Sequence, residues 1–237
     1  MKFFEFGNVY FYNGKVIDNQ NPLAPYSEFG HLDLFLTGNK QEELWNQKPQ
    51  PVDFFDLKHY VMSILHLLRV HQNQLEVKEG TLKHYEYSLE LYLDGKRLAT
   101  FGKLDKKTLK LFDIKKDVYH ATLCWNTLMS NYGKAPEIHF VPLSKFPSVR
   151  RDLAMIFDKN VTFEQVKNVA LAAENKILQE MSLFDVYEGD KIPAGKKQYA
   201  MSFILMSTTA TLTDKMIEKA MARIQQAMEK ELGGVLR

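Results

Sequence analysis

One short segment in the second half of the chain carries residue types and a spacing that could do chemistry. In residues 183–189 (LFDVYEG), Asp185 and Tyr187 are two positions apart, so a β-strand would present both side chains on one side. A tyrosine ring can stack on a nucleobase, and a carboxylate can accept hydrogen bonds from the Watson–Crick edge of a guanine. The pair predicts a surface for unpaired nucleotides. The alternative is that Tyr187 is a half-buried tyrosine of a sheet.

A second charged segment, residues 146–157 (FPSVRRDLAMIF), places Arg150, Arg151 and Asp152 inside an otherwise apolar, strand-like run. These three residues could contact RNA. Charge-assisted hydrogen bonds between guanidinium and carboxylate groups at the start of a strand explain them better. We therefore expect a structural ion-pair device at this position.

Groups for catalysis or metal binding are sparse. All seven histidines lie before residue 140, so the C-terminal region has no imidazole base. His59, His66 and His71 do not have the i, i+4 spacing of a zinc-binding helix. The single cysteine, Cys124, excludes a disulfide within the chain and fits a buried strand residue better than a nucleophile. Because P-loop, dinucleotide-binding and nucleophile-elbow motifs are also missing, we predict no catalytic residue and no metal site.

Composition is typical of a globular protein with two domains: 237 residues, 45% hydrophobic and 25% charged. Residues 146–237 carry 13 basic and 12 acidic side chains, so any nucleic-acid surface must be a local patch. No apolar run approaches the length of about 18 residues that spans a membrane, and the start lacks a signal peptide. We expect a cytoplasmic protein without membrane contact. Because the chain opens directly in a strand-like segment, we also expect it to be cut from a longer protein.

Residues 1–142 are predicted to form an α+β domain built on an antiparallel sheet. Its clearest helix covers residues 53–70, with Asp53 as the N-cap. Asp94–Gly95 predicts a tight hairpin turn. The remaining predicted elements are strands at the start of the chain and at 31–37, 88–93, 97–101 and 117–124, and a short helix at 105–112. A proline-containing linker near residues 135–145 ends the domain.

Residues 143–237 carry local signals for the order β-α-β-β-α-β, which is a ferredoxin-like fold. Thr162 and Gln165 predict a capping box at the first helix, and Thr213 and Gly233 predict the two ends of the second. The methionine-rich stripe of the second helix indicates a core-facing side. The predicted strands cover 149–158, 180–188, 197–206 and 234–237. Such a sheet has a free face, and free faces of this kind stack bases.

Five segments resemble, in order and spacing, motifs of the C-terminal part of bacterial phenylalanyl-tRNA synthetase β subunits. They match the family patterns F-E-x-G-x-V-F, E-x-x-W with D-F-[FY]-D-L-K-G, I-Y-x-x-G-x-x-I-G-x-x-G, F-P-x-x-R-R-D and L-F-D-V-Y-x-G. In this chain these are residues 1–12, 42–58, 91–102, 146–152 and 183–189. There are two departures: residues 82–88 (LKHYEYS) stand where the family has H-P-G, and His59 replaces the glycine of D-L-K-G.

The resemblance implies a truncated, non-catalytic class II synthetase-like module over residues 1–142, which serves subunit association. It implies an anticodon-binding domain over residues 143–237 that contacts phenylalanine tRNA. Asp185 and Tyr187 then lie at the first anticodon base, and the family's further contacts fall on Gln198 and Arg237. Next to them, Lys196 and Lys197 are predicted phosphate contacts, the alternative being a solvated lysine pair.

The resemblance also implies that this chain is not an enzyme on its own and holds no cofactor. The parent α2β2 enzyme would use ATP and Mg²⁺ at an active site on its α subunit. Upstream of this chain, the parent β subunit would carry an editing domain and the helix of the first class II motif.

A different function class shares the predicted element order. ACT-like regulatory domains bind small molecules such as amino acids at paired interfaces with glycine-rich loops, whereas the loop after the first strand here, residues 158–161 (DKNV), has no glycine. A hydrolase that uses Cys124 or a histidine has the least support. Binding of phenylalanine tRNA, measured against an unrelated tRNA, would separate these classes.

Overall fold

The computed structural model describes residues 1–14, 21–132, 140 and 142–237. The chain divides into two compact units, Met1–Ile138 and His139–Arg237. This division falls close to the predicted boundary between residues 142 and 143. Most of the predicted linker at 135–145 lies outside the described residues.

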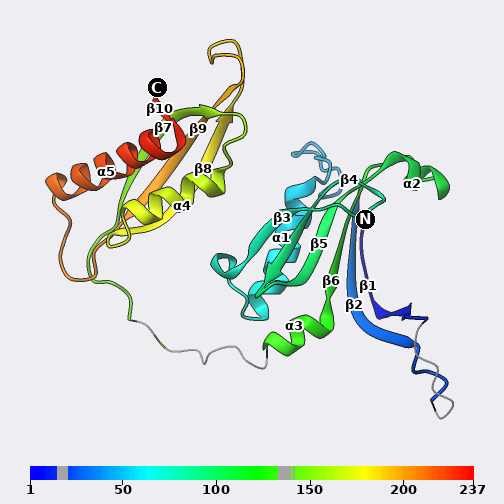
Figure 1. Ribbon diagram of the computed structural model, residues 1–237. Helices are drawn as coiled ribbons and strands as arrows, with labels where there is room; N and C mark the ends of the chain where they lie inside the picture. The colour runs from blue at the N-terminus through cyan, green and yellow to red at the C-terminus, as the bar shows by residue number, and fades with distance from the viewer. Residues whose placement is uncertain (15–20, 133–139, 141) are drawn as a thin grey trace. The chain divides into compact units, whose positions relative to one another are not determined.

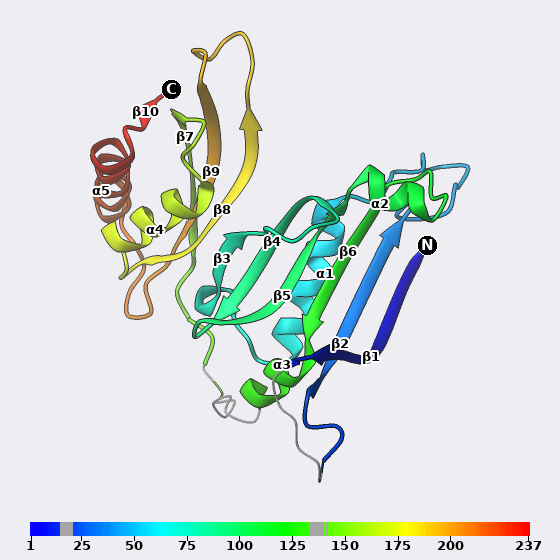
Figure 2. The same cartoon turned by 45° about the vertical axis from the view of Figure 1, so that its right-hand side comes forward.

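In the described part of the N-terminal unit, six strands form one antiparallel sheet in the order β1-β2-β6-β5-β4-β3 (Figures 1 and 2). The strands are β1 (Lys2–Tyr12), β2 (Tyr26–Thr37), β3 (Glu76–Glu79), β4 (Tyr85–Leu93), β5 (Lys96–Leu104) and β6 (Val118–Cys124). The helices are α1 (Phe54–Leu67), α2 (Lys106–Leu111) and α3 (Trp125–Tyr132), with a 3-10 turn at Gln72–Gln74. The predicted α+β class with an antiparallel sheet is confirmed.

Helix α1 begins where the sequence predicts. The Asp53 carboxylate accepts hydrogen bonds from the backbone N–H groups of Phe55 and Asp56, and the Asp56 carboxylate accepts one from the Asp53 N–H, which completes a capping box. The helix ends at Leu67, before the predicted residue 70, because Arg69 adopts a φ of 60° that an α-helix does not allow. Its apolar side packs on the sheet in a core that includes Leu57, Val61, Leu65, Phe101 and Leu123.

The β4–β5 hairpin confirms the turn predicted at Asp94–Gly95. The two residues have φ values of 50° and 73°, as a type I′ turn requires. The sequence does not predict β3 or α3. Strand β3 is exposed along its length, and α3 buries only Leu128. Elements this short carry too little apolar periodicity to stand out, and their pairing and packing with neighbours define them.

The sheet face opposite α1 carries a chain of hydrogen-bonded polar groups. His120 Nε2 lies 3.0 Å from Asp33 Oδ1, and His120 Nδ1 lies 2.6 Å from the Tyr85 hydroxyl oxygen. Because an ionised carboxylate only accepts, His120 donates from Nε2, and in the tautomer without a proton on Nδ1 the Tyr85 O–H donates to that nitrogen. Burial raises the pKa of Tyr85, which keeps its hydroxyl a donor. Phe35 stacks on the His120 ring with centroids 4.5 Å apart.

We expect acid to destabilise the N-terminal unit through Asp33. Burial raises the pKa of Asp33, but hydrogen bonds from His120 and Thr122 outweigh it, so this pKa is lowered from its ordinary value of 3.8. A lowered folded-state pKa contributes stability above the unfolded-state pKa, and this contribution is lost as pH falls through the folded-state pKa. Between about pH 4 and pH 2, the wild-type chain should therefore lose more unfolding free energy than Asp33→Asn, which does not titrate.

Urea unfolding followed by tryptophan fluorescence measures this difference. Both tryptophans, Trp45 and Trp125, lie in the N-terminal unit, so the signal reports on that unit. The curves are compared near neutral pH and at steps down to about pH 2. Equal losses of unfolding free energy in wild type and Asp33→Asn would contradict the assignment.

The C-terminal unit has the predicted ferredoxin-like order β-α-β-β-α-β, and its antiparallel sheet runs β10-β7-β9-β8. Its elements are β7 (Val149–Asp158), α4 (Phe163–Ala173), β8 (Leu178–Tyr187), β9 (Lys196–Leu205), α5 (Asp214–Leu232) and β10 (Val235–Leu236). Helices α4 and α5 lie on one face of the sheet (Figure 2) and enclose a core that includes Met155, Phe157, Met201, Phe203 and Ile224. The other face, hereafter the open face, is not covered by a helix in the described part of this unit.

The helix-end signals of this unit are largely confirmed. Thr162 Oγ1 accepts from the Gln165 N–H and Gln165 Oε1 accepts from the Thr162 N–H, as a capping box requires. Thr213 occupies the N-cap position of α5, but its side chain makes no capping hydrogen bond. Asp214 instead places a negative charge in the first turn, where the helix dipole favours it. Gly233 ends α5 with a left-handed φ of 63°.

Candidate nucleic-acid interface

The open face is defined by its register with the central strand β9. Side chains alternate along β9, so the buried Met201 and Phe203 face the helices while Gln198, Ala200 and Ser202 face the open side. Strand β7 pairs antiparallel with β9 in the same register. Its open-face residues, opposite Gln198, Ala200, Ser202 and Ile204, are Ile156, Ala154, Asp152 and Arg150.

A β-bulge in β8 turns the Asp185 and Tyr187 side chains to the open face. Leu183 pairs with Met201 and Asp185 pairs with Ala200, so Phe184 is an extra residue between the two pairs. Strict alternation would put Leu183, Asp185 and Tyr187 on one side of the strand. The bulge lets Leu183 stay in the core while the other two side chains face away from the helices. Asp185 and Tyr187 therefore share a side, as the spacing predicts.

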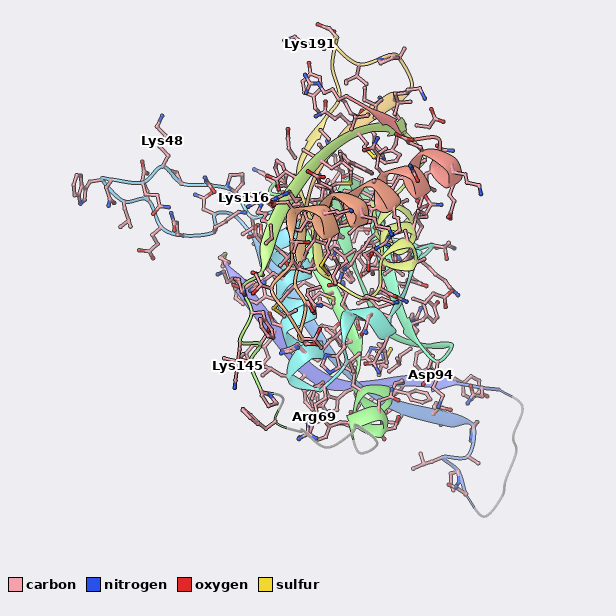
Figure 3. All side chains as sticks on the ribbon, turned by 90° about the vertical axis from the view of Figure 1, so that its left-hand side faces the viewer. Lys48, Arg69, Asp94, Lys116, Lys145 and Lys191 are labelled. Atoms are coloured by element: carbon pink, nitrogen blue, oxygen red, sulfur yellow. The ribbon has the colours of Figure 1, made fainter. Side chains whose placement is uncertain are left out.

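Gly189 leaves room for the ring of Tyr187. A Cβ atom at Gly189 would lie 2.6 Å from the Tyr187 hydroxyl oxygen and 2.8 Å from its Cζ. The phenol therefore lies over the backbone of the β8–β9 connection, from which Lys191 projects beyond the ends of the strands (Figure 3). Because the Tyr187 residue is only half-buried, part of the ring stays accessible to a stacking partner.

The floor of the open face consists of small and polar side chains of β9. Gln198, Ala200 and Ser202 are buried although no helix of the described unit covers them. The Ser202 hydroxyl lies 2.8 Å from that of Ser182, whereas Gln198 Oε1 has no hydrogen-bond partner among the described residues. An unsatisfied buried acceptor costs about 1–3 kcal/mol. This oxygen lies in the residue that pairs with Tyr187 but is shielded from solvent, so a ligand reaches it only if neighbouring side chains move.

The two predicted phosphate-contact lysines lie on different faces of the sheet. Lys196 pairs with Asp158 at the end of the open face, and its Nζ lies 2.9 Å from Asp158 Oδ1. Lys197 pairs with the buried Phe157, and its Nζ lies 4.9 Å from the centroid of the buried Tyr199 ring. Its ammonium group therefore points away from Asp185 and Tyr187, and only Lys196 shares their side.

Arg237 lies at the opposite edge of the open face from β8. Its backbone N–H donates to the carbonyl oxygen of Ala154 at 3.3 Å, which continues the pairing of Val235 with Ile156. Alternation from Val235 puts the exposed Arg237 on the open side. Except for Lys197, all the predicted contact residues thus share this face: Asp185, Tyr187, Lys196, Gln198 and Arg237.

The predicted ion pairs at the start of β7 are present. Arg150 Nε donates to Asp152 Oδ1 at 2.9 Å, and Arg151 Nη2 lies 3.9 Å from Asp214 Oδ1. Both pairs are exposed, so each contributes at most about 1 kcal/mol to stability. The sequence predicts one structural device made of the three charged residues of β7, but the structure separates them. Arg150 and Asp152 face the open side, and Arg151 faces the helices.

Chemistry at the other candidate groups is not favoured. Burial raises the pKa of the Cys124 thiol, and the partial opposing effect of Arg97 does not reverse it. A raised pKa keeps the thiol protonated and weakens it as a nucleophile. Within the described residues, we find no cluster of three His, Cys, Asp or Glu side chains that could hold a metal ion. Likewise, none of the described helices has the length and apolar character to cross a membrane.

Comparisons with known proteins match both units. Residues 1–125 match the family model of the phenylalanyl tRNA synthetase beta chain CLM domain, and residues 144–237 match that of the ferredoxin-fold anticodon binding domain. The chain is 42% identical over 240 residues to the phenylalanine–tRNA ligase beta subunit of Bacteroides fragilis, with 100% of this chain and 29% of that protein covered. It is 36% identical over 235 residues to the beta subunit of Porphyromonas gingivalis, with 99% of this chain and 29% of that protein covered.

A more distant relative has the same name: the beta subunit of Bacillus subtilis is 32% identical over 204 residues, with 85% of this chain and 25% of that protein covered. The chain thus spans 29% of the length of the first of these relatives. The two family matches cover nearly the whole chain in an order that agrees with its two compact units. The chain therefore belongs to the family of phenylalanyl-tRNA synthetase beta subunits and represents its C-terminal part.

Proposed function

We propose that this chain is the tRNA-binding and subunit-association part of a phenylalanine–tRNA ligase beta subunit. In this role, the C-terminal unit recognises the anticodon region of phenylalanine tRNA during aminoacylation. One observation carries the proposal: Asp185 and Tyr187 lie side by side on an uncovered sheet face of a ferredoxin-fold anticodon binding domain. Aromatic and hydrogen-bonding groups on such faces recognise unpaired bases.

The geometry supports a distinct role for each group. The Tyr187 ring stacks on the first anticodon base, and the Asp185 carboxylate accepts from the N1–H and N2–H groups of a guanine there. Gln198 Oε1 has no partner among the described residues, and it accepts a further hydrogen bond from the same nucleotide once binding displaces the side chains that shield it. Arg237 and Lys196 contact phosphate or sugar at the edges of the face. Lys197 is left out of this proposed set because it points to the other side of the sheet.

Base contacts, more than phosphate contacts, should dominate this interface. Two of the cations of the open face are paired with carboxylates: Arg150 with Asp152, and Lys196 with Asp158. Paired cations neutralise fewer phosphates and release fewer counterions. The near-equal numbers of basic and acidic residues in this unit agree with such a surface.

The N-terminal unit supports a role in association between subunits. Many aromatic side chains of β1 and α1 are exposed, among them Phe4 at 73% and Phe55 at 72%. An apolar groove lies between β1, β2 and α1, with its lining formed by Lys2, Phe3, Phe4, Leu34, Leu36, Tyr60 and Ile64. Exposed apolar surface of this kind is typical of protein–protein contacts.

The complete enzyme would be a cytoplasmic α2β2 assembly that uses ATP and Mg²⁺ at an active site on the α subunit. In this proposal, this chain holds no ATP or Mg²⁺ site. Its proposed contributions are the placement of the tRNA and the contact with the α subunit.

A change at Asp185 tests the proposed base recognition. The wild-type chain should prefer phenylalanine tRNA with guanine at the first anticodon position over the same tRNA with adenine there. A well-placed hydrogen-bonding pair discriminates by about 1–3 kcal/mol, or about five- to a hundred-fold. In Asp185→Asn, an amide N–H₂ faces the donors of guanine, so most of this preference should be lost. Competition binding with the two tRNAs at fixed salt measures the ratio.

The matched control is Asp190→Asn in the β8–β9 connection. It removes the same charge from an exposed position outside the strands. Its guanine preference should stay at the wild-type ratio. If Asp185→Asn keeps the full preference, or if both variants lose it equally, Asp185 does not read the base.

A further inference from the structure

A second aromatic ring lies on the open face, and the assignments above do not use it. Phe184 is the extra residue of the β8 bulge and is 55% exposed. Phenylalanine side chains are usually buried in folded proteins, whereas this ring is exposed in the middle of a strand. The bulge therefore presents two neighbouring side chains, Phe184 and Asp185, where a regular strand would present one.

Arg150 reaches this ring from across the sheet. The residue lies in β7, two strands from β8, yet its guanidinium carbon is 5.6 Å from the centroid of the Phe184 ring. Asp152 fixes the guanidinium through the 2.9 Å hydrogen bond from Arg150 Nε. On the open face of β9, Ile204 pairs with Arg150, and the next two side chains toward Phe184 are the short Ser202 and Ala200. Phe184 and Arg150 thus form a cation–π pair on the open face, hereafter the platform.

We propose that Phe184 and Arg150 form a second base-stacking site, which takes the nucleotide next to the one that stacks on Tyr187. This inference rests on the proposed function of the same face. Phe184 and Tyr187 are three residues apart on β8, and a strand rises about 3.3 Å per residue, so the rings can take two successive unstacked bases. Aromatic rings and guanidinium planes are the groups on which unpaired bases stack.

The polar surroundings of the ring favour a base over an apolar protein segment as its occupant. Asp152, Asp185 and Arg150 all face the same side as Phe184. An apolar segment would take Asp185 and the Arg150–Asp152 ion pair out of water without supplying new hydrogen bonds, which is costly. A base stacks its apolar face on the ring while its polar edge stays available to the same groups. The two nearby carboxylates also disfavour a phosphate at this position.

Three variants of Phe184 test the platform in the 237-residue chain with the anticodon stem-loop of phenylalanine tRNA. Phe184→Ala should weaken binding about five-fold, the lower end of the range for stacking of one base. Phe184→Tyr should keep wild-type affinity because it keeps an aromatic face. Phe184→Leu keeps apolar area but no aromatic face and should weaken binding nearly as much as alanine. Equal affinity of all four proteins, with unchanged circular dichroism, would overturn the proposal.

Abasic stem-loops identify the occupant. Two RNAs are used: one lacks the base before the first anticodon position, and the other lacks the base after it. The affinity of each RNA is measured for wild type and for Phe184→Ala. The affinity loss from Phe184→Ala should vanish with one of these two RNAs and persist with the other. Persistence with both would overturn the proposal. The proposed function is tested separately by Tyr187→Ala. If Tyr187→Ala weakens RNA binding and Phe184→Ala does not, only the second stacking site is rejected.

Discussion

Replacing Phe203 by alanine is expected to destabilise the C-terminal unit strongly and to leave the stability of the N-terminal unit unchanged. Phe203 is fully buried in β9, between the core residues of the two helices and the sheet. Truncation of a buried phenylalanine costs about 3–5 kcal/mol, from lost burial and the cavity left behind. A domain of this size has a stability of about 5–15 kcal/mol, so the change removes a large part of it.

The distribution of tryptophans lets this experiment separate the two units. Trp45 and Trp125 both lie in the N-terminal unit, so fluorescence follows that unit alone while far-UV circular dichroism follows both. With Phe203→Ala, the circular dichroism should show an early transition that fluorescence does not. Phe101→Ala in the N-terminal core is the mirror case, since Phe101 is also fully buried.

Phe184→Ala is the matched control in the same sheet, because it truncates an exposed phenylalanine. It should leave both transitions within about 1 kcal/mol of wild type, as surface substitutions do. If Phe203→Ala shifts both signals together in one transition, the two units do not unfold separately. The domain boundary that we propose near residue 142 would then not separate two independently unfolding units.

The fold of the C-terminal unit could be predicted from local signals. The capping box of Thr162 and Gln165 and the glycine after α5 fix where helices begin and end. With the apolar patterns between them, they leave few ways to arrange four strands and two helices. In the N-terminal unit, Asp94–Gly95 does the same for the β4–β5 hairpin because the φ values it requires are accessible to few residues.

The orientation of single side chains was harder to predict. Which way Lys197 points depends on the register of β9, and the sides of Asp185 and Tyr187 depend on a bulge at Phe184. A bulge reverses the face to which every later side chain of its strand points, and no residue type in this segment predicts the bulge. The sequence therefore indicates the pair Asp185 and Tyr187, whereas the partnerless Gln198 oxygen and the contact between Arg150 and Phe184 require the structure.

Tyr187→Ala is the substitution expected to have the largest effect on tRNA binding. Stacking of a base on an aromatic ring is worth about 1–3 kcal/mol, so affinity for phenylalanine tRNA should fall about five- to a hundred-fold. The fold should persist because the ring is only half-buried and its hydroxyl end rests on the backbone at Gly189. Tyr187→Phe keeps the stacking face and should bind like wild type. Filter binding or fluorescence anisotropy at fixed salt measures the change.

The chain offers two matched controls for this prediction. Val186→Ala shortens the adjacent residue, which is 48% exposed and pairs with the buried Tyr199, and therefore faces the other side of β8. It should bind tRNA as wild type does. Gly189→Ala removes no group that contacts RNA, but its Cβ would lie 2.6 Å from the Tyr187 hydroxyl oxygen and must displace the ring. A ring that stacks on a base should lose affinity when displaced. If Tyr187→Ala and Gly189→Ala both bind as tightly as Val186→Ala, Tyr187 is a packing residue.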